Sequence, residues 1–257
     1  MWRSAPFWYG RFPRLTFTMR RLSRANPERE MAFLDALCDR ARIGVDIGAK
    51  VGMYTYRIRA RSAEVIAFEP IPMFNRMLKA VFDGKRGRIE PYAVSSQRGT
   101  ATLRMPYDGK GTRQFGRSTI DPANPLKHEA VARTEELEVE TRTLDEYELA
   151  NVGFIKIDVE GHEIAVLEGA QRTIAASKPN MLIECNDDHQ PQATAKLAAW
   201  LRAHEYAGYF ADGKTLQPIE QYQHAEHWVK RGIENFMCVH QSRPEVLPAL
   251  AARVAAH

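Results

Sequence analysis

The sequence has few cysteines, no long apolar run and little net charge. Its cysteines, Cys38, Cys185 and Cys238, are odd in number and far apart, so they make neither a disulfide framework nor a zinc-binding spacing. No apolar run approaches the roughly 20 residues of a membrane-spanning helix. Residues 1–30 lack the uninterrupted apolar stretch of a signal peptide. These absences favour a reducing compartment, and we expect a cytoplasmic protein without a transmembrane segment.

The positive charge of the chain is concentrated near its beginning. The formal net charge is only +4 over 257 residues, but residues 1–30 hold seven arginines against two glutamates. Because the rest of the chain is close to neutral, a nucleic-acid partner is not expected. We predict a basic and aromatic N-terminal arm over residues 1–25, which packs on the domain or on a second copy in a homodimer. A loose tail and a weak contact with a membrane surface are the alternatives.

The dinucleotide fingerprint G-x-G-x-x-G is also absent. In its place, Val45–Gly52 reads as a buried strand that ends in a glycine turn, and Val65–Pro70 reads as the next strand. Glu69, near the end of that second run, follows Gly52 by 17 residues. Backbone at such a turn can approach a ligand closely, and a carboxylate on the next strand can bind ribose hydroxyls. The layout therefore predicts a nucleoside-binding α/β unit.

Three further runs identify a family. Thr143-Leu144-Asp145 precedes the block Phe154–Glu163, which reads FIKIDVEGHE, and Met181–Glu184 follows downstream. Together with the turn Asp46–Gly52, in the pattern D-x-G-x-x-x-G, these motifs resemble the FkbM-type methyltransferases, which depend on S-adenosylmethionine (SAM). The resemblance covers about residues 43–240 and depends on the order and spacing of several separate motifs. One departure is Lys50, where asparagine is usual.

Apolar runs and helical patterns alternate along the chain, which predicts a mainly parallel sheet with helices on both faces. The resemblance implies the Rossmann-like class I methyltransferase fold, with seven strands, one of them antiparallel. We predict strands at 43–47, 64–69, 88–94, 153–159, 180–185, 206–210 and 236–240, and helices at 52–61, 73–82, 162–176, 193–204 and 244–256. Residues 26–257 then form a single domain. Its segment at about 95–152 is longer than a crossover needs, and we interpret it as a substrate-facing insertion.

The resemblance also implies a set of cofactor-binding residues. Backbone around Gly48 and Gly52 would lie along the cofactor, Glu69 would accept its ribose hydroxyls, and Asp46 would face its ammonium group. Ala93 would wall the adenine. Helix capping is the alternative for Asp46, and ordinary core packing is the alternative for Ala93. The complete predicted set is Asp46, Gly48, Ala49, Lys50, Gly52, Glu69, Ala93 and Asp158.

Polar residues at the end of the strand at 153–159 are the predicted catalytic group. Asp158, Glu160 and His162 would lie at the sheet edge where ligands bind in open α/β folds, and one of them would act as a general base. The alternative is that Glu160 and Glu163 only cap the following helix. The run Glu184–His189 adds oxygen ligands of the kind that Mg²⁺ takes, but we assign no metal residue.

The sequence thus predicts a SAM-dependent methyltransferase. The resemblance favours O-methylation of a hydroxyl on a sugar, a glycan precursor or a secondary metabolite, so the expected partner is a small-molecule or glycan acceptor. An N- or carboxyl-methyltransferase on the same fold is one alternative. A non-catalytic nucleotide-binding scaffold is another.

Overall fold

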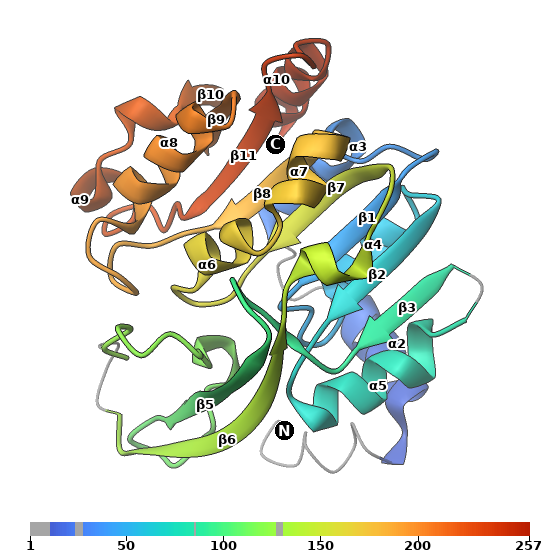
Figure 1. The fold of residues 1–257 in the computed structure, drawn as a ribbon. Coiled ribbons are helices and arrows are strands. Elements are labelled where there is room, and N and C mark those ends of the chain that lie inside the picture. The colour runs from blue at the N-terminus through green and yellow to red at the C-terminus, as the bar shows by residue number, and fades with distance from the viewer. Residues whose placement is uncertain (1–10, 24–27, 85, 127–130) are drawn as a thin grey trace.

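A large sheet forms the centre of the protein (Figure 1), as seen in a computed structural model that describes residues 11–23, 28–84, 86–126 and 131–257. Its strands run in the order β10-β9-β11-β8-β7-β1-β2-β3. The five strands from β8 to β3 are parallel, whereas β11 is antiparallel to both of its neighbours. The bounds are β1 (Ile43–Ile47), β2 (Glu64–Phe68), β3 (Gly87–Glu90), β7 (Val152–Ile157), β8 (Asn180–Glu184), β9 (Tyr206–Asp212), β10 (Thr215–Pro218) and β11 (Asn235–His240). The predicted mostly parallel sheet with an antiparallel strand near its edge is confirmed.

The predicted count of seven strands is wrong, because β10 adds an eighth. It pairs antiparallel with β9 across a two-residue turn, in which Gly213 adopts a φ of 55°. Residues 208–215 also match the letters of a phosphate-binding loop, G-x-x-x-x-G-K-T. Such a loop joins a strand to a helix, whereas these residues form a hairpin, so the match has no structural basis.

A smaller sheet lies beside the large one (Figure 1). Its strands are β4 (Ala93–Val94), β5 (Gly99–Tyr107) and β6 (Arg133–Arg142), in the order β4-β6-β5. The predicted strand at 88–94 is therefore divided between the two sheets. The chain leaves the large sheet at Pro91, which has no amide hydrogen to donate to a neighbouring strand. The role of the small sheet in binding a substrate stays a prediction.

Both faces of the large sheet are covered by helices. The strands alternate between two cores: Phe154 packs with α3, α4 and α10, while Ile155 and Ile157 pack with α6, α7 and α8. A strand buried on both faces reads as a continuous apolar run. The helices are α2 (Pro13–Leu22), α3 (Leu34–Leu37), α4 (Met53–Arg59), α5 (Pro72–Phe82), α6 (Glu163–Glu168), α7 (Gln171–Ser177), α8 (Ala193–Ala203), α9 (His224–His227) and α10 (Val246–Ala256), with 3₁₀ turns η1 (Arg29–Ala32), η2 (Phe115–Arg117), η3 (Leu144–Tyr147) and η4 (Ile219–Gln221).

Helix α2 is the part of the predicted N-terminal arm that the structure describes. It lies along α5 (Figure 1), and Phe17 is buried with its ring centroid 5.0 Å from that of Phe82. Residues 1–10 and 24–25 of the arm lie outside the described residues. No helix in the described ranges has both the length and the apolar character needed to cross a bilayer.

The single helix predicted over 162–176 is divided into α6 and α7. At the junction, Gly169 lies against Ser95, the residue that follows β4. A Cβ atom on Gly169 would be 2.0 Å from the Ser95 carbonyl oxygen. Asp145 then caps the start of α7, where its Oδ1 accepts a hydrogen bond from the Thr173 amide at 2.8 Å. The close approach and the cap therefore mark the point where α6 ends and a second helix, α7, begins.

We expect Gly169→Ala to lower the free energy of unfolding by about 1–3 kcal/mol, because backbone must move to admit the methyl group. Gly99→Ala is the matched control, since the nearest atom to its new Cβ would be at an ordinary 3.6 Å. Urea unfolding of both variants measures the difference. Equal stability of the two variants would show that the Gly169 contact is not tight in solution.

Candidate active site

The glycine turn after β1 brings three strand ends together. The amides of Gly48 and Ala49 donate to the Phe68 carbonyl at 3.1 and 3.0 Å, which ties the turn to β2. Gly48 has a φ of 84°, and a Cβ on it would lie 1.9 Å from the Asp158 carbonyl oxygen. Only glycine satisfies both demands. The turn therefore lies directly against the residue that follows β7.

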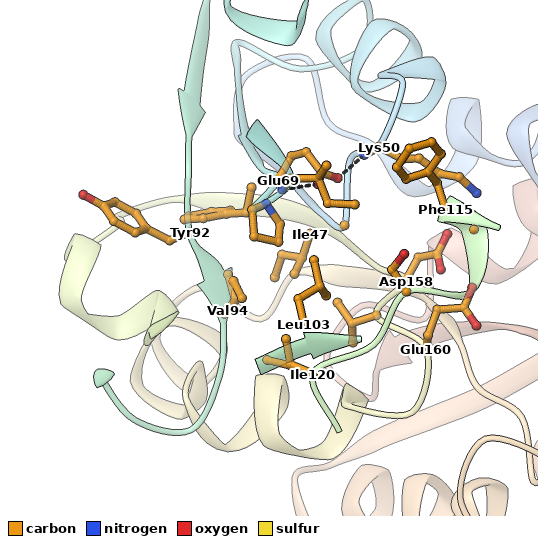
Figure 2. Close-up of a pocket in the computed structure, with 18 residues that line it drawn as sticks. Ile47, Lys50, Glu69, Tyr92, Val94, Leu103, Phe115, Ile120, Asp158 and Glu160 are labelled. Carbon is orange, nitrogen blue, oxygen red and sulfur yellow. Dashed lines mark hydrogen bonds between the residues drawn. The ribbon is translucent and has the colours of Figure 1, made fainter. Parts of the chain in front are cut away.

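Glu69 is a fixed, buried carboxylate beside this turn (Figure 2). Its Oε2 accepts a hydrogen bond from the Lys50 amide and its Oε1 accepts one from the Ile71 amide, both at 2.7 Å. Burial raises the pKa of Glu69 to about 7. Each carboxylate oxygen keeps a further lone pair that can accept a donor from a ligand.

Glu69 lines a cavity, here called the nucleoside pocket, between the strand ends and the small sheet. It has an open volume of about 640 Å³, including its mouth. Its walls are the glycine turn, the segment from Glu69 to Ile71, the end of β4 and the turn η2. Figure 2 shows Phe115 of η2 on the same side of the pocket as Lys50 and Asp158. The pocket is thus bounded by the sheet edge on one side and by the small sheet on the other.

A second cavity, here called the Arg57 pocket, lies on the other side of the turn. It is lined by Asp46, Arg57 and Lys156, and by the C-terminal end of α2, and it has an open volume of about 1640 Å³. Both cavities are lined by Gly48, Lys50 and Asp158. A ligand that lies across Gly48 can therefore reach both.

A third cavity, here called the insert pocket, lies against the small sheet. It is smaller, about 390 Å³ with its mouth, and Tyr107, Gln114, Arg117 and His189 are among its lining residues. Glu160 lines both this cavity and the nucleoside pocket. The turn η2 separates the two, since Phe115 faces one and Arg117 the other.

Glu160 belongs to an acidic cluster at the ends of β7 and β8. Ligand oxygens of Asp158, Glu160 and Glu184 all lie within 4.8 Å of one another. The buried Lys156 ammonium lies 3.9 Å from Asp158 and 3.8 Å from Glu184. Although burial opposes its charge, these two carboxylates raise the pKa of Lys156. Carboxylates in this arrangement suit Mg²⁺, but Lys156 already supplies a positive charge to them.

Glu160 is held in an unusual backbone conformation. Its φ is 56°, and the Asn124 side chain donates to its carbonyl at 2.7 Å. The Glu160 Oε2 lies 3.1 Å from Nε2 of His189. Burial, together with the charge of Asp158, raises the pKa of Glu160 well above its usual range. A carboxyl group whose pKa is raised toward neutrality is suited to general-base catalysis.

The structure brings most of the predicted residues together, but not His162. Asp46 is buried at the Arg57 pocket, and its Oδ2 accepts a hydrogen bond from Thr55 at 2.5 Å. His162 instead points to Ser95, with 2.9 Å between Nε2 and Oγ, and does not line the three cavities. His189 takes the place beside Glu160. The only feature of the sequence that could have predicted this is that His189 follows β8, whose carboxyl end lies at the same sheet edge.

A sheet with this strand order, a glycine turn after β1 and a carboxylate after β2 defines the class I methyltransferase fold. The sequence matches the Methyltransferase FkbM domain over residues 46–210, and the chain belongs to this family. It is 26% identical over 171 residues to Methyltransferase 1 of Beauveria bassiana (strain ARSEF 2860), covering 59% of this chain and 68% of that protein. The protein is a methyltransferase, and SAM is the methyl donor of this class.

A solved structure supports the fold assignment. The crystal structure of Methyltransferase FkbM from Methylobacillus flagellatus KT is similar with a TM-score of 0.50 and 15% identity. The similarity covers 79% of this chain but only 44% of that one, so this chain spans less than half of that relative's length.

Buried carboxylates at the site should make the stability of the free protein depend on pH. Burial raises the pKa of Glu163 to about 7, whereas an unfolded glutamate titrates near 4.3. Between about pH 4.3 and pH 7, Glu163 is therefore protonated in the folded state but ionised in the unfolded state. The stability of the folded state falls as the pH rises through this range. Between about pH 5 and pH 8, the free energy of unfolding should therefore fall less in Glu163→Gln than in the wild type. We expect the two decreases to differ by about 1 kcal/mol or more.

Urea unfolding of both proteins at several pH values measures this difference. The amide oxygen of glutamine can still accept the hydrogen bond that Glu163 receives from the Gly161 amide at 2.8 Å. Parallel pH profiles for the two proteins would show that Glu163 does not titrate in this range.

Proposed function

We propose that this protein is a SAM-dependent O-methyltransferase that acts on a hydroxyl of a sugar, a glycan precursor or a secondary metabolite. One observation carries the proposal: Glu160 lines both the nucleoside pocket and the insert pocket. A methyl donor in the first and a hydroxylated acceptor in the second would meet at a carboxylate. Gln114, Arg117 and His189 contribute polar side chains to the lining of the insert pocket, which supports an acceptor with hydrogen-bonding groups.

The nucleoside pocket fits the adenosine part of SAM. Glu69 presents two oriented carboxylate oxygens for the ribose hydroxyls. Gly48 lines this pocket, so a ligand bound here would lie against the backbone of the glycine turn. Ala93 and Val94 are buried apolar residues of the pocket wall, and an apolar wall suits the face of an adenine ring.

SAM would supply an activated methyl group, and the chain's task is to place the acceptor oxygen in line with it. Orientation of this kind can contribute about 7 kcal/mol or more in favourable cases. Glu160 would accept the hydroxyl proton of the acceptor, and its contact with Nε2 of His189 at 3.1 Å would hold the carboxylate in place. Asp158, which lines the nucleoside pocket and the Arg57 pocket, would border the same point from the cofactor side. A catalytic role of His162 remains a prediction.

Glu69→Ala should weaken SAM binding more than about tenfold, because two charge-assisted hydrogen bonds to the ribose are lost. Isothermal titration measures the affinity, and circular dichroism checks the fold. Glu64→Ala is the matched control, since Glu64 lies at the opposite end of β2. SAM binding by the Glu69→Ala variant with wild-type affinity would show that Glu69 does not bind the ribose. Binding of NAD in preference to SAM by the wild type would favour a different nucleotide-binding function.

Glu160→Gln should lower kcat by about 10²-fold or more and leave SAM affinity within a few-fold, because only proton removal is lost. Turnover is measured with methyl-labelled SAM and a metabolite or glycan extract, and mass spectrometry identifies the methylated product. Near-normal turnover in this variant would show that Glu160 is not a general base. Catalysis would then depend only on the positioning of the acceptor relative to SAM. Methylation of an amine or a carboxylate in the wild-type product would support the N- or carboxyl-methyltransferase alternative.

A further inference from the structure

Arg57 lines the pocket that is named after it, on the far side of the glycine turn from Glu69. It lies in the second turn of α4, and its Nε is buried without a hydrogen-bond partner among the described residues. No ion pair of its guanidinium occurs there either. A buried donor without a partner is unfavourable, and a ligand with a suitable acceptor would remove this penalty.

Two neighbouring cations of the Arg57 pocket are already engaged. Lys156 lies between Asp158 and Glu184, and Nη1 of Arg21 donates to the Tyr56 hydroxyl at 2.9 Å. Arg57 is therefore better placed than either of them to bind an added anion. A guanidinium can hold a carboxylate with two parallel hydrogen bonds.

The same pocket also offers negative charge. Asp158 keeps 27% of its side chain exposed, and the buried Asp46 lines the same cavity. A cation and carboxylates that share one cavity complement a zwitterion such as an α-amino acid, whose ammonium and carboxylate are attached to one carbon atom. The chemical class that fits this cavity is therefore an α-amino acid group.

The two cavities meet at Gly48, Lys50 and Asp158, so one ligand can occupy both. If the ribose is bound at Glu69, the remainder of the ligand must cross Gly48 to enter the Arg57 pocket. SAM has this layout, with a nucleoside at one end and an amino acid at the other.

We propose that Arg57 binds the α-carboxylate of SAM, while Asp158 and Asp46 face its α-ammonium group. This assignment rests on the proposed binding of the nucleoside at Glu69. In this assignment, α4 supplies a ligand-binding side chain as well as continuing the chain from the glycine turn. This assignment also brings the C-terminal end of α2, which lines the same cavity, next to the amino-acid end of the cofactor.

The test compares two ligands that differ only at the amino-acid end. S-adenosylhomocysteine carries the amino acid, whereas 5′-methylthioadenosine has the same nucleoside and sulfur without it. Titration calorimetry with Arg57→Gln should show S-adenosylhomocysteine binding weakened by about tenfold or more and 5′-methylthioadenosine binding unchanged. Arg59→Gln is the matched control, because Arg59 is on the same helix but does not line the pocket.

Unchanged affinity of Arg57→Gln for S-adenosylhomocysteine would overturn the proposal. An equal loss for both ligands would also overturn it, since Arg57 would then support the shape of the site and not the carboxylate. A wild-type protein that binds neither ligand would instead refute the proposed function, on which this assignment depends. The wild-type titrations therefore separate the two failures.

Discussion

The contact between Gly48 and the carbonyl of Asp158 is the constraint on which the site depends. A side chain at position 48 would place its Cβ 1.9 Å from that oxygen, so the turn can lie against β7 only because residue 48 is glycine. The Asp158 amide in turn donates to the Ile47 carbonyl at 3.1 Å, and the turn amides bond to Phe68. These hydrogen bonds tie the ends of β1, β2 and β7 to one another. The nucleoside pocket and the Arg57 pocket are the two sides of this junction.

A second constraint is the balance of buried charge around Lys156. The side chain is fully buried, and its ammonium is within 4 Å of Asp158 and Glu184 and 3.3 Å from the Asn235 Oδ1. Burying several carboxylates without a cation would be costly, and the effective penalty is still several kcal/mol per ion. Lys156 offsets part of this cost for the carboxylates next to it. Glu160 lies further along the same edge, where burial and the charge of Asp158 raise the pKa of its carboxyl group.

Much of the fold could be predicted from the sequence, because strands buried on both faces are nearly continuous apolar runs. β1 has the predicted bounds, and β2, β7 and β8 differ from the predicted ones by one or two residues. The errors occur where tertiary contacts override the local pattern. The helix over 162–176 is periodic, but Gly169 must approach Ser95, so the helix is interrupted. The strand at 88–94 is interrupted by Pro91, and β10 is a four-residue edge strand with little apolar signal.

The sequence by itself determined the family, the glycine turn after β1 and the place of Glu69 just after β2, because these depend on short motifs whose spacing follows from one strand, one turn and the next strand. Tertiary structure decided which side chains face one another. Glu160 and His189 are 29 residues apart and belong to different strand ends, so no local pattern pairs them. His162, only two residues from Glu160, is turned to Ser95, because Glu160 and Gly161 both adopt positive φ values and reverse the direction of the chain. That Nε of Arg57 is buried without a hydrogen-bond partner among the residues that the structure describes depends in the same way on tertiary packing around α4.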